Sequence, residues 1–341
     1  MAIVLINLGT PDDATVPAVR RYLREFLMDP YVIDIPTIPR WMLVNLIIAP
    51  FRAKRSAKAY QKIWHKDGSP LLLHTSELCQ KLDNQLEEQR IHMAMRYGSP
   101  SIDSVLSTLK DETELIIVPL YPQFAHATTQ TVLDEVLNAL NKHNYEGKTY
   151  WVPPFFDDPR YIEMLTKIQP IDVNSHLLIS FHGLPIRQLP CVTKEQYLCK
   201  GKADHCPGPQ EQFPNCYRAH CYETARNIAK QLDLSTEQWS ISFQSWLGKI
   251  PWIEPYTDDK LEELVQSGVT KIQVICPAFA TDCLETLEEI NIELRELFFE
   301  LGGEEFTYIP CLNADDVWVE SIEKIILETK IPLSRTSLAS K

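Results

Sequence analysis

Five of the chain's nine cysteines lie between Cys191 and Cys221, just behind an apolar run that ends at His182. Thiolates and imidazoles are common ligands of protein-bound zinc and iron. A cysteine-rich segment beside a histidine therefore makes metal chemistry the first function to test. The alternative is a loop whose thiols are incidental.

His182 directly follows a predicted strand at residues 177–181 and precedes Gly183. In open parallel sheets, ligands bind beyond the carboxyl ends of the strands. A neutral imidazole placed there can accept a proton or bind a divalent metal. A capping or buried structural histidine is the other interpretation of the same residue.

Three glutamates follow another strand end at four-residue spacing: Glu285, Glu289 and Glu293. On a helix, side chains at this spacing share one face. Such a line of carboxylates can pass protons or a hard cation. A solvated acidic stripe is the alternative, because like charges four residues apart cost only about 0.2–0.5 kcal/mol per pair. The position next to a strand end favours a functional role.

Short apolar, β-branched runs alternate with helix-like segments along the whole chain. This pattern is typical of parallel sheets that helices cover on both faces. The predicted strands are residues 2–8, 91–96, 115–120, 177–181, 239–243, 271–276 and 306–309. The predicted helices are residues 75–89, 128–141, 222–232, 258–267 and 283–299.

The two halves of the chain echo each other. LGTP at 8–11 and HGLP at 182–185 follow strands, as do PQFA at 122–125 and PAFA at 277–280. Such short strings can match by chance, but two echoes in the same order, each at the end of a strand, favour a duplication. We therefore expect an α/β protein with two similar doubly wound parallel-sheet domains facing a central cleft. The expected domains are residues 1–169 and 170–335, and the second carries a cysteine-rich insert at 186–221. Neither glycine-rich nucleotide-binding motif occurs, so a nucleotide cofactor has little support.

The net charge of −13 argues against nucleic acid as a partner, because phosphate binding needs a basic face. The first eight residues show no basic region before their apolar run, so they predict a strand and a cytoplasmic protein. Residues 41–51 form the longest apolar segment, which is too short to span a bilayer. Basic residues follow it, so segment 41–58 predicts either peripheral contact with an anionic membrane face or a core helix with a solvated basic end.

Over residues 3–329 the chain resembles the ferrochelatases, lyases that insert Fe²⁺ into a porphyrin. The most specific motifs are SFHGLP at 180–185, ATDCLETLEE at 280–289, LYPQ at 120–123, and FQS at 243–245 with PWIEPYTD at 251–258. Weaker ones lie at 7–11 and 60–70. The resemblance implies two similar domains with a porphyrin cleft between them, and the terminal step of haem biosynthesis as the activity.

The resemblance also assigns site residues. The family's catalytic histidine and glutamate fall on His182 and Glu285, and its acidic helical channel falls on Glu289 and Glu293. These four residues are accordingly the expected ligands of the incoming iron. The expected substrate-binding residues are Tyr121, Gln123, Trp252 and Asp282.

Two residues depart from the family pattern. Cys283 stands where many relatives carry a second histidine, and Trp246 stands where many bacterial relatives carry a basic residue. Protoporphyrin IX is the expected substrate, because the residue before Gly9 is a leucine and not the tyrosine of many coproporphyrin enzymes. Coproporphyrin III or another tetrapyrrole is the alternative. A second alternative is an iron–sulfur redox sensor that kept the fold and lost catalysis.

The cysteines follow the pattern C-x7-C-x6-C-x9-C-x4-C, which differs from the paired C-x2-C of zinc ribbons. A C-x4-C pair does occur among [2Fe–2S] ligands. Residues 215–221 are similar to a subset of microbial ferrochelatases with an internal [2Fe–2S] cluster. That resemblance implies a cluster held by Cys199, Cys206, Cys216 and Cys221, with Cys191 spare and with a structural or sensing role.

Overall fold

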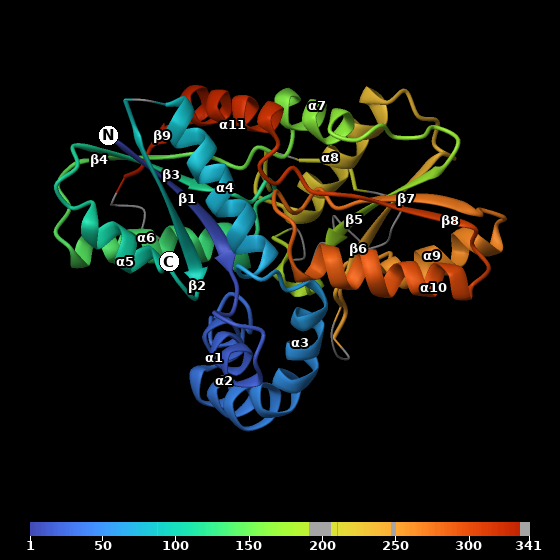
Figure 1. Ribbon diagram of the computed structural model, residues 1–341, viewed down its shortest axis with the longest axis horizontal. Helices are drawn as coiled ribbons and strands as arrows, with labels where there is room; N and C mark the ends of the chain where they lie inside the picture. The colour runs from blue at the N-terminus through green and yellow to red at the C-terminus, as the bar shows by residue number, and fades with distance from the viewer. Residues whose placement is uncertain (87, 191–205, 210, 247–249, 335–341) are drawn as a thin grey trace. The chain divides into compact units, whose positions relative to one another are not determined.

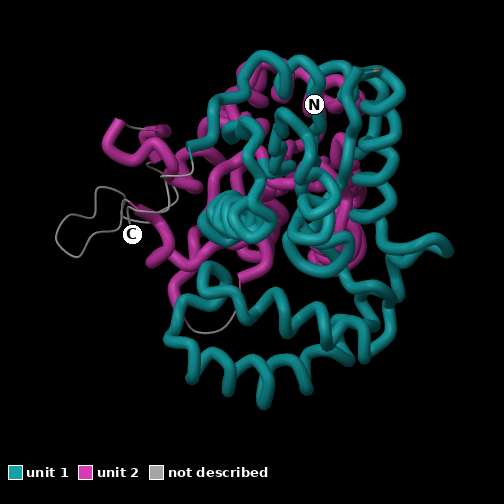
Figure 2. The backbone as a smooth tube through the Cα atoms, turned by 90° about the vertical axis from the view of Figure 1, so that its left-hand side faces the viewer, with its two compact units in different colours: residues 1–121, 126–154, 313–341 teal, residues 122–125, 155–312 magenta. Residues whose placement is uncertain are grey.

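The computed structural model describes residues 1–86, 88–190, 206–209, 211–246 and 250–334 of the chain. Packing of the chain divides it into two compact units (Figure 2). Unit 1 comprises Met1–Tyr121, His126–Pro154 and Asn313–Lys341, and unit 2 comprises Pro122–Ala125 and Phe155–Leu312. Each unit contains one sheet with helices packed around it, so the predicted α/β class with two parallel-sheet domains is confirmed.

The unit 1 sheet has the strand order β2-β1-β3-β4-β9, and only β9 runs antiparallel to its neighbour. The first strand pairs with β2 on one side and β3 on the other. Both faces of the sheet are covered, which is why β1 is a continuous apolar run with no polar alternation. The strands are β1 (Ala2–Gly9), β2 (Arg90–Tyr97), β3 (Glu114–Pro119), β4 (Lys148–Trp151) and β9 (Ile331–Pro332).

Helices cover both faces of this sheet (Figure 1). On one face α5 and α6 pack on Val4 and Ile6 of β1. On the other face α4 contacts β1 and β2, and α11 packs on α4. The covering helices are α4 (Pro70–Gln85), α5 (Ile102–Thr108), η2 (His126–Gln130), α6 (Thr131–Lys142) and α11 (Asp316–Thr329).

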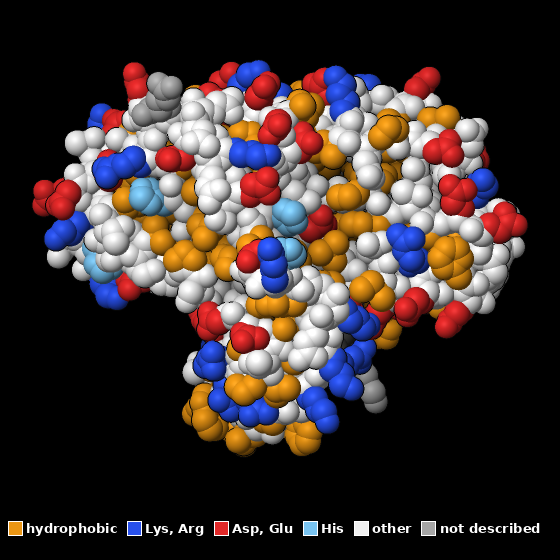
Figure 3. All heavy atoms as spheres, in the orientation of Figure 1, with side chains coloured by type: hydrophobic (Ala, Val, Ile, Leu, Met, Phe, Trp, Pro, Cys, Tyr) orange, Lys and Arg blue, Asp and Glu red, His pale blue; other side chains and the backbone are white. Residues whose placement is uncertain are grey.

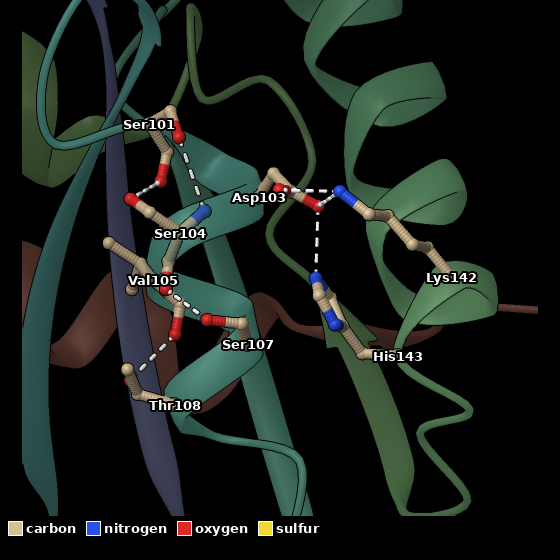
Figure 4. Close-up of polar contacts among 8 residues, drawn as sticks. All are labelled: Ser101, Asp103, Ser104, Val105, Ser107, Thr108, Lys142 and His143. Atoms are coloured by element: carbon tan, nitrogen blue, oxygen red, sulfur yellow. Dashed lines mark hydrogen bonds and ion pairs between the residues drawn. The ribbon is translucent and has the colours of Figure 1, made fainter.

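Side-chain contacts fix where α5 begins and how it meets α6 (Figure 4). The Ser101 hydroxyl accepts a hydrogen bond from the Ser104 amide at 3.2 Å, which caps the first turn of α5. Asp103 then accepts hydrogen bonds from Lys142 at 2.8 Å and from His143 at 2.9 Å. These bonds lower the pKa of Asp103, so its carboxylate stays charged while it joins the two helices.

A helical lobe extends from the same unit after β1. It consists of α1 (Val16–Leu27), α2 (Thr37–Met42), the π-helix η1 (Leu43–Ile48) and α3 (Ala49–Ile63). Helix α1 packs on α3. The end of the lobe around α2 and η1 carries exposed apolar side chains, with lysines and arginines beside them (Figures 1 and 3). Among the described helices, none has a stretch apolar and long enough to cross a bilayer.

The unit 2 sheet has the strand order β6-β5-β7-β8, and all its strands are parallel. The order matches β2-β1-β3-β4 of unit 1 when the strands of each unit are numbered along the chain. This agreement is what a duplicated domain would give. The strands are β5 (His176–His182), β6 (Trp239–Gln244), β7 (Lys271–Ile275) and β8 (Glu305–Ile309).

The helices of unit 2 also pack on both faces of their sheet. Helix α9 and the helix pair η4–α10 enclose a core with Leu178, Val274 and Phe306. On the other side α7 packs on α8, and α8 contacts β6. The helices are α7 (Pro159–Lys167), the 3₁₀ turn η3 (Ile186–Gln188), α8 (Tyr217–Gln231), α9 (Thr257–Gln266), the π-helix η4 (Glu285–Leu294) and α10 (Arg295–Glu300).

The compact units differ from the domains 1–169 and 170–335 in three places, the first of which is that Pro122–Ala125 belong to unit 2. Helix α7 belongs to unit 2 because it packs on α8, which moves the boundary from residue 169 to residue 154. The C-terminal segment belongs to unit 1 because α11 packs on α4 and β9 pairs with β4. The insert predicted at 186–221 starts within unit 2, and its residues 191–205 and 210 lie outside the described chain.

Candidate functional site

Most of the predicted site residues lie in unit 2, near the carboxyl ends of two neighbouring strands. Strand β5 lies between β6 and β7 in the sheet. The strand that follows β5 in sequence is therefore added on one side of it, and the next strand is added on the other side. This switch point is where open parallel sheets bind ligands. His182 is the last residue of β5, and Asp282 and Glu285 belong to the segment that follows β7.

His182 is half-buried, and a hydrogen bond fixes its ring. The distance from its Nδ1 to the carbonyl oxygen of Gly183 is 2.6 Å. A carbonyl oxygen can only accept, so this geometry assigns the proton to Nδ1 and leaves the lone pair of Nε2 free. The ring also meets Phe279 edge-on, with the ring centroids 6.4 Å apart. The imidazole is therefore held in the tautomer that can accept a proton at Nε2.

Burial lowers the pKa of His182, while the nearby Glu285 carboxylate and the Gly183 carbonyl act in the opposite direction. The lowered pKa keeps the imidazole neutral at neutral pH. A neutral ring beside a carboxylate can accept a proton, and the carboxylate stabilises the imidazolium that results.

Gly183 joins the end of β5 to the end of β6. Its amide donates to the Gln244 carbonyl at 2.7 Å, and a Cβ at residue 183 would lie only 2.7 Å from that oxygen. Only glycine permits this close approach. The Gln244 side chain continues the link, because its Nε2 donates to the Glu285 carbonyl at 2.8 Å. Gln244 therefore connects the strand end of His182 to the first residue of η4.

The three predicted glutamates lie on η4, which is a π-helix. Their exposure rises along the helix: Glu285 and Glu289 are half-buried, and Glu293 is exposed. The Ser245 hydroxyl donates a hydrogen bond to Glu289. The sequence did not single out Glu288, which is buried. Wide π-turns are frequent at functional sites, and here one presents a carboxylate row that leads from half-buried to exposed.

Asp282 is buried and orders the loop before η4. Its Oδ1 accepts hydrogen bonds from the Tyr308 hydroxyl, from the Thr286 hydroxyl at 2.9 Å and from the Cys311 amide at 3.4 Å. Thr286 in turn accepts from the Cys283 amide at 3.0 Å. Asp282 therefore fixes the turn that carries Glu285. Tyr308 was not among the predicted residues, because it comes from β8 and has no motif of its own.

Cys283 lies two residues before Glu285, and its thiol is close enough to the Glu285 carboxylate for the charge to act on it. Burial raises the pKa of Cys283, and the Glu285 carboxylate raises it further, so the thiol stays protonated. A protonated thiol has one proton to donate, and the carboxylate is the acceptor. Cys283 thus lies next to the predicted catalytic glutamate.

The two tryptophans of the predicted site have different surroundings. Trp252 is half-buried beside Gly183, and its Cε3 atom lies 3.4 Å from where a Cβ at residue 183 would be. Residue 252 also forms a bridge with Pro185. Trp246 has 44% of its surface exposed and stacks on Tyr256 at 5.2 Å. Trp252 thus supports the loop after His182, while Trp246 presents an aromatic face to solvent.

Gln123 and Tyr121 fall in different units. Gln123 is buried in unit 2, where its amide nitrogen donates to Thr224 and to the Pro277 carbonyl, each at 3.1 Å. Both amide hydrogens are therefore used inside the unit. Tyr121 is buried at the end of β3 in unit 1, and its hydroxyl has no hydrogen-bond partner among the described residues.

Three of the four predicted cluster ligands are described: Cys206, Cys216 and Cys221 are all buried. Burial raises the pKa of Cys221, and the thiols of Cys216 and Cys206 raise it further, so each of them lies close enough to Cys221 to act on it. Cys199 and Cys191 lie outside the described residues. Among the residues that are described, no three His, Cys, Asp or Glu side chains converge on a position for one metal ion.

His220 stands next to Cys221, but both of its ring nitrogens are used. Nδ1 accepts from the Phe124 amide at 3.1 Å, and Nε2 donates to the Pro214 carbonyl at 2.6 Å. The ring stacks on Phe156 at 3.7 Å, and burial lowers its pKa to about 4. His220 therefore remains neutral and anchors the segment before α8, and both of its ring nitrogens are occupied.

The ferrochelatase family model matches residues 1–330. The chain belongs to the ferrochelatase family. A ferrochelatase of Coxiella burnetii is 45% identical over 332 residues, covering 95% of this chain and 92% of that protein. A ferrochelatase of Legionella pneumophila is also 45% identical over 332 residues, covering 96% of this chain and 98% of that protein.

Solved structures with low sequence identity share the fold. The Fe³⁺-bound SirB of Bacillus subtilis has a TM-score of 0.54 at 11% identity, covering 99% of this chain and 97% of its own. The cobalt complex of the sirohydrochlorin chelatase SirB from Bacillus subtilis subspecies spizizenii has a TM-score of 0.54 at 10% identity, with the same coverage. These likenesses concern the architecture alone.

Proposed function

We propose that this ferrochelatase inserts Fe²⁺ into protoporphyrin IX, with His182 as the proton acceptor and Glu285 as its anionic partner. Insertion releases two pyrrolic protons as the dication enters the ring, so a base must stand ready. The observation that carries the proposal is the fixed tautomer of His182, whose Nδ1–H is donated to the Gly183 carbonyl and whose Nε2 is therefore unprotonated. The lowered pKa of the same ring keeps it unprotonated at neutral pH.

The carboxylates of η4 supply the rest of the proposed route. Glu289 and Glu293 extend from Glu285 toward the exposed end of the helix. Carboxylate oxygens suit hard cations and accept protons. We assign Glu289 and Glu293 to the passage of protons or of the iron substrate. Asp282 fixes the start of their helix, and Trp252 supports the loop after His182.

Anaerobic haem formation tests this function. The purified protein is given Fe²⁺ with protoporphyrin IX or with coproporphyrin III, and the haem product is followed by its absorption. Faster turnover of protoporphyrin IX supports the proposal. Preference for coproporphyrin III would change the proposed substrate but not the proposed reaction. If neither porphyrin were metallated, the iron–sulfur sensor would be favoured.

We further propose that Cys199, Cys206, Cys216 and Cys221 hold a [2Fe–2S] cluster. The fit rests on three buried cysteines, two of which act on the pKa of the third, and on a neighbouring imidazole whose nitrogens are both occupied. Four thiolates are the usual ligand set of such a cluster, which when bound supplies a covalent cross-link and a one-electron centre. Protein made with iron present should be brown and contain two irons and two sulfides per chain. Cys216→Ser should lose the colour, whereas Cys79→Ser, on α4, should keep it.

A third proposal concerns the helical lobe of unit 1. We propose that its end rests on an anionic membrane face and that the protein is cytoplasmic and peripheral. Six apolar side chains are between 51% and 79% exposed there: Ile38, Trp41, Met42, Leu46, Ile47 and Phe51. Four exposed cations adjoin them: Arg52, Lys54, Arg55 and Lys58. The exposed apolar face favours this interpretation over a core helix (Figure 3).

Co-sedimentation with vesicles containing phosphatidylglycerol tests the membrane proposal. Phe51 is 79% exposed, and burying such a ring yields about 1.5–3 kcal/mol, so Phe51→Ser should weaken binding by about 10-fold or more. Added salt should weaken it too, because the cations contribute through screened attraction. Phe299→Ser, at an exposed phenylalanine of unit 2, is the matched control. Equal binding by both variants would refute the assignment.

A further inference from the structure

The carbonyl of His182 lies at the end of β5, beyond the last residue that pairs with β7. Residues along a strand alternate in the neighbour to which their backbone groups point. Leu177 and Gly183 donate to β6, through the carbonyls of Gln238 and Gln244. By this alternation His182 points to the side of β7, but the β5–β7 pairing ends at Ile179. The sheet therefore provides no strand partner for the His182 carbonyl.

Tyr217 supplies the missing partner. Its hydroxyl donates to the His182 carbonyl at 2.8 Å, and its side chain is buried. Tyr217 is the first residue of α8 and directly follows Cys216. The contact thus joins the end of β5, which carries His182, to the first turn of α8, which directly follows Cys216.

The same side chain lies near one of the cysteines. Cys221 lies four residues after Tyr217, on the same face of α8, and it is close enough to raise the pKa of the tyrosine. A tyrosine hydroxyl has one proton and two acceptor sites, so it can serve the His182 carbonyl and the sulfur together. A change at the sulfur therefore acts directly on the group that holds the His182 backbone.

We propose that Tyr217 is a positioning residue for His182 and links Cys221 to the strand end that carries His182. The inference rests on the proposed roles of His182 and of Cys221. A sulfur bound to iron has no proton to donate, so it would compete with the His182 carbonyl for the tyrosine proton. The state of Cys221 thereby sets how firmly the strand end is held.

Tyr217→Phe tests the link, with Tyr222→Phe as the matched control. Tyr222 is a buried tyrosine on the same helix, and its hydroxyl accepts from Arg218 at 3.5 Å. Removal of the Tyr217 hydroxyl should lower kcat by about 10-fold and leave KM for the porphyrin unchanged. A misplacement of 1 Å can lower the rate by about 10²-fold, so a smaller movement of His182 is enough for this loss. Tyr222→Phe should change neither constant.

Two spectroscopic readings separate positioning from general destabilisation. In metal-free protein labelled with ¹³C-histidine, the ring signal of His182, assigned by its absence in His182→Ala, should shift in Tyr217→Phe and not in the control. In iron-loaded protein, Tyr217→Phe should have a lower cluster reduction potential, because hydrogen bonds to the sulfurs help to set it.

The outcomes are distinct. An unchanged ring signal together with an unchanged kcat would overturn the positioning role. A shifted ring signal with an unchanged potential would overturn the link to the cysteines. Protein that takes up no iron would refute the cluster alone, and kcat and the ring signal would still decide on Tyr217.

Discussion

Gly183→Ala is the substitution that most directly tests how the site is built. The new Cβ would lie 2.7 Å from the Gln244 carbonyl oxygen, whereas ordinary contact begins at 3.4 Å. The backbone must therefore open by about 0.7 Å, because no side chain can rotate out of the way. This movement breaks the hydrogen bond of 2.7 Å between the Gly183 amide and the same oxygen.

The movement acts on catalysis more than on folding. Overpacking of this kind costs about 1–3 kcal/mol of unfolding free energy, which a chain of this size tolerates. Displacement of His182 by several tenths of an ångström should lower kcat between about 10-fold and 100-fold. Porphyrin affinity, measured by fluorescence quenching, should fall by less than about 3-fold, since little substrate binding energy is removed. Anaerobic haem formation gives kcat, and urea unfolding gives the free energy.

Gly268→Ala is the matched control. Gly268 follows α9 and has φ +96, so alanine is strained there, yet nothing lies within 4 Å of its Cβ position. This variant should lose about 1–2 kcal/mol of unfolding free energy and keep its kcat. If Gly183→Ala retained the wild-type kcat, or if both variants lost it equally, the close approach of the two strand ends would have no part in catalysis.

Three further predictions concern the groups around Glu285. Because burial lowers the pKa of His182, kcat/KM should stay level as pH falls through 6.5 and should decline only at lower pH, when the ring gains a proton. Glu285→Gln removes the carboxylate that favours the protonated ring, so it should lower the pKa of His182 further, as measured by NMR of the ring. A pKa that rose in this variant would contradict the pairing. Cys283→Ser keeps a donor to Glu285 and should keep its activity, whereas Cys283→Val should lose about 10-fold in kcat, the equivalent of one charged hydrogen bond. Asp282→Ala removes the acceptor that two buried hydroxyls and an amide share, and it should lower the unfolding free energy by about 3 kcal/mol in urea titrations. A loss below about 1 kcal/mol would show that the loop is held by other contacts.

The central strands could be predicted from the sequence because their burial leaves a local signal. The runs at 2–8 and 271–276 correspond to β1 (Ala2–Gly9) and β7 (Lys271–Ile275), each a continuous apolar stretch. The short strands β4 and β9 were missed. They are four and two residues long, and β9 lies at the edge of the sheet, where it pairs with a strand about 180 residues earlier in the sequence, so no local pattern marks them.

The candidate site was only partly predictable for the same reason. His182 and Glu285 stand in motifs at strand ends, which a sequence displays. The π-helical winding of η4 is set by its hydrogen bonds and not by apolar periodicity, so the burial of Glu288 could not be foreseen. Gln244 and Tyr217 act through backbone carbonyls of residues far away in the sequence, and such bonds leave no trace in residue type.

The most direct test is a comparison of wild-type protein with His182→Ala in one anaerobic experiment. Protoporphyrin binding is measured first by fluorescence quenching, and Fe²⁺ is then added while haem absorption is recorded. If the imidazole accepts the pyrrolic protons, the variant should bind the porphyrin about as tightly as the wild type and form no haem above the uncatalysed rate. Haem formation at the wild-type rate by the variant would show that the proton acceptor is another group.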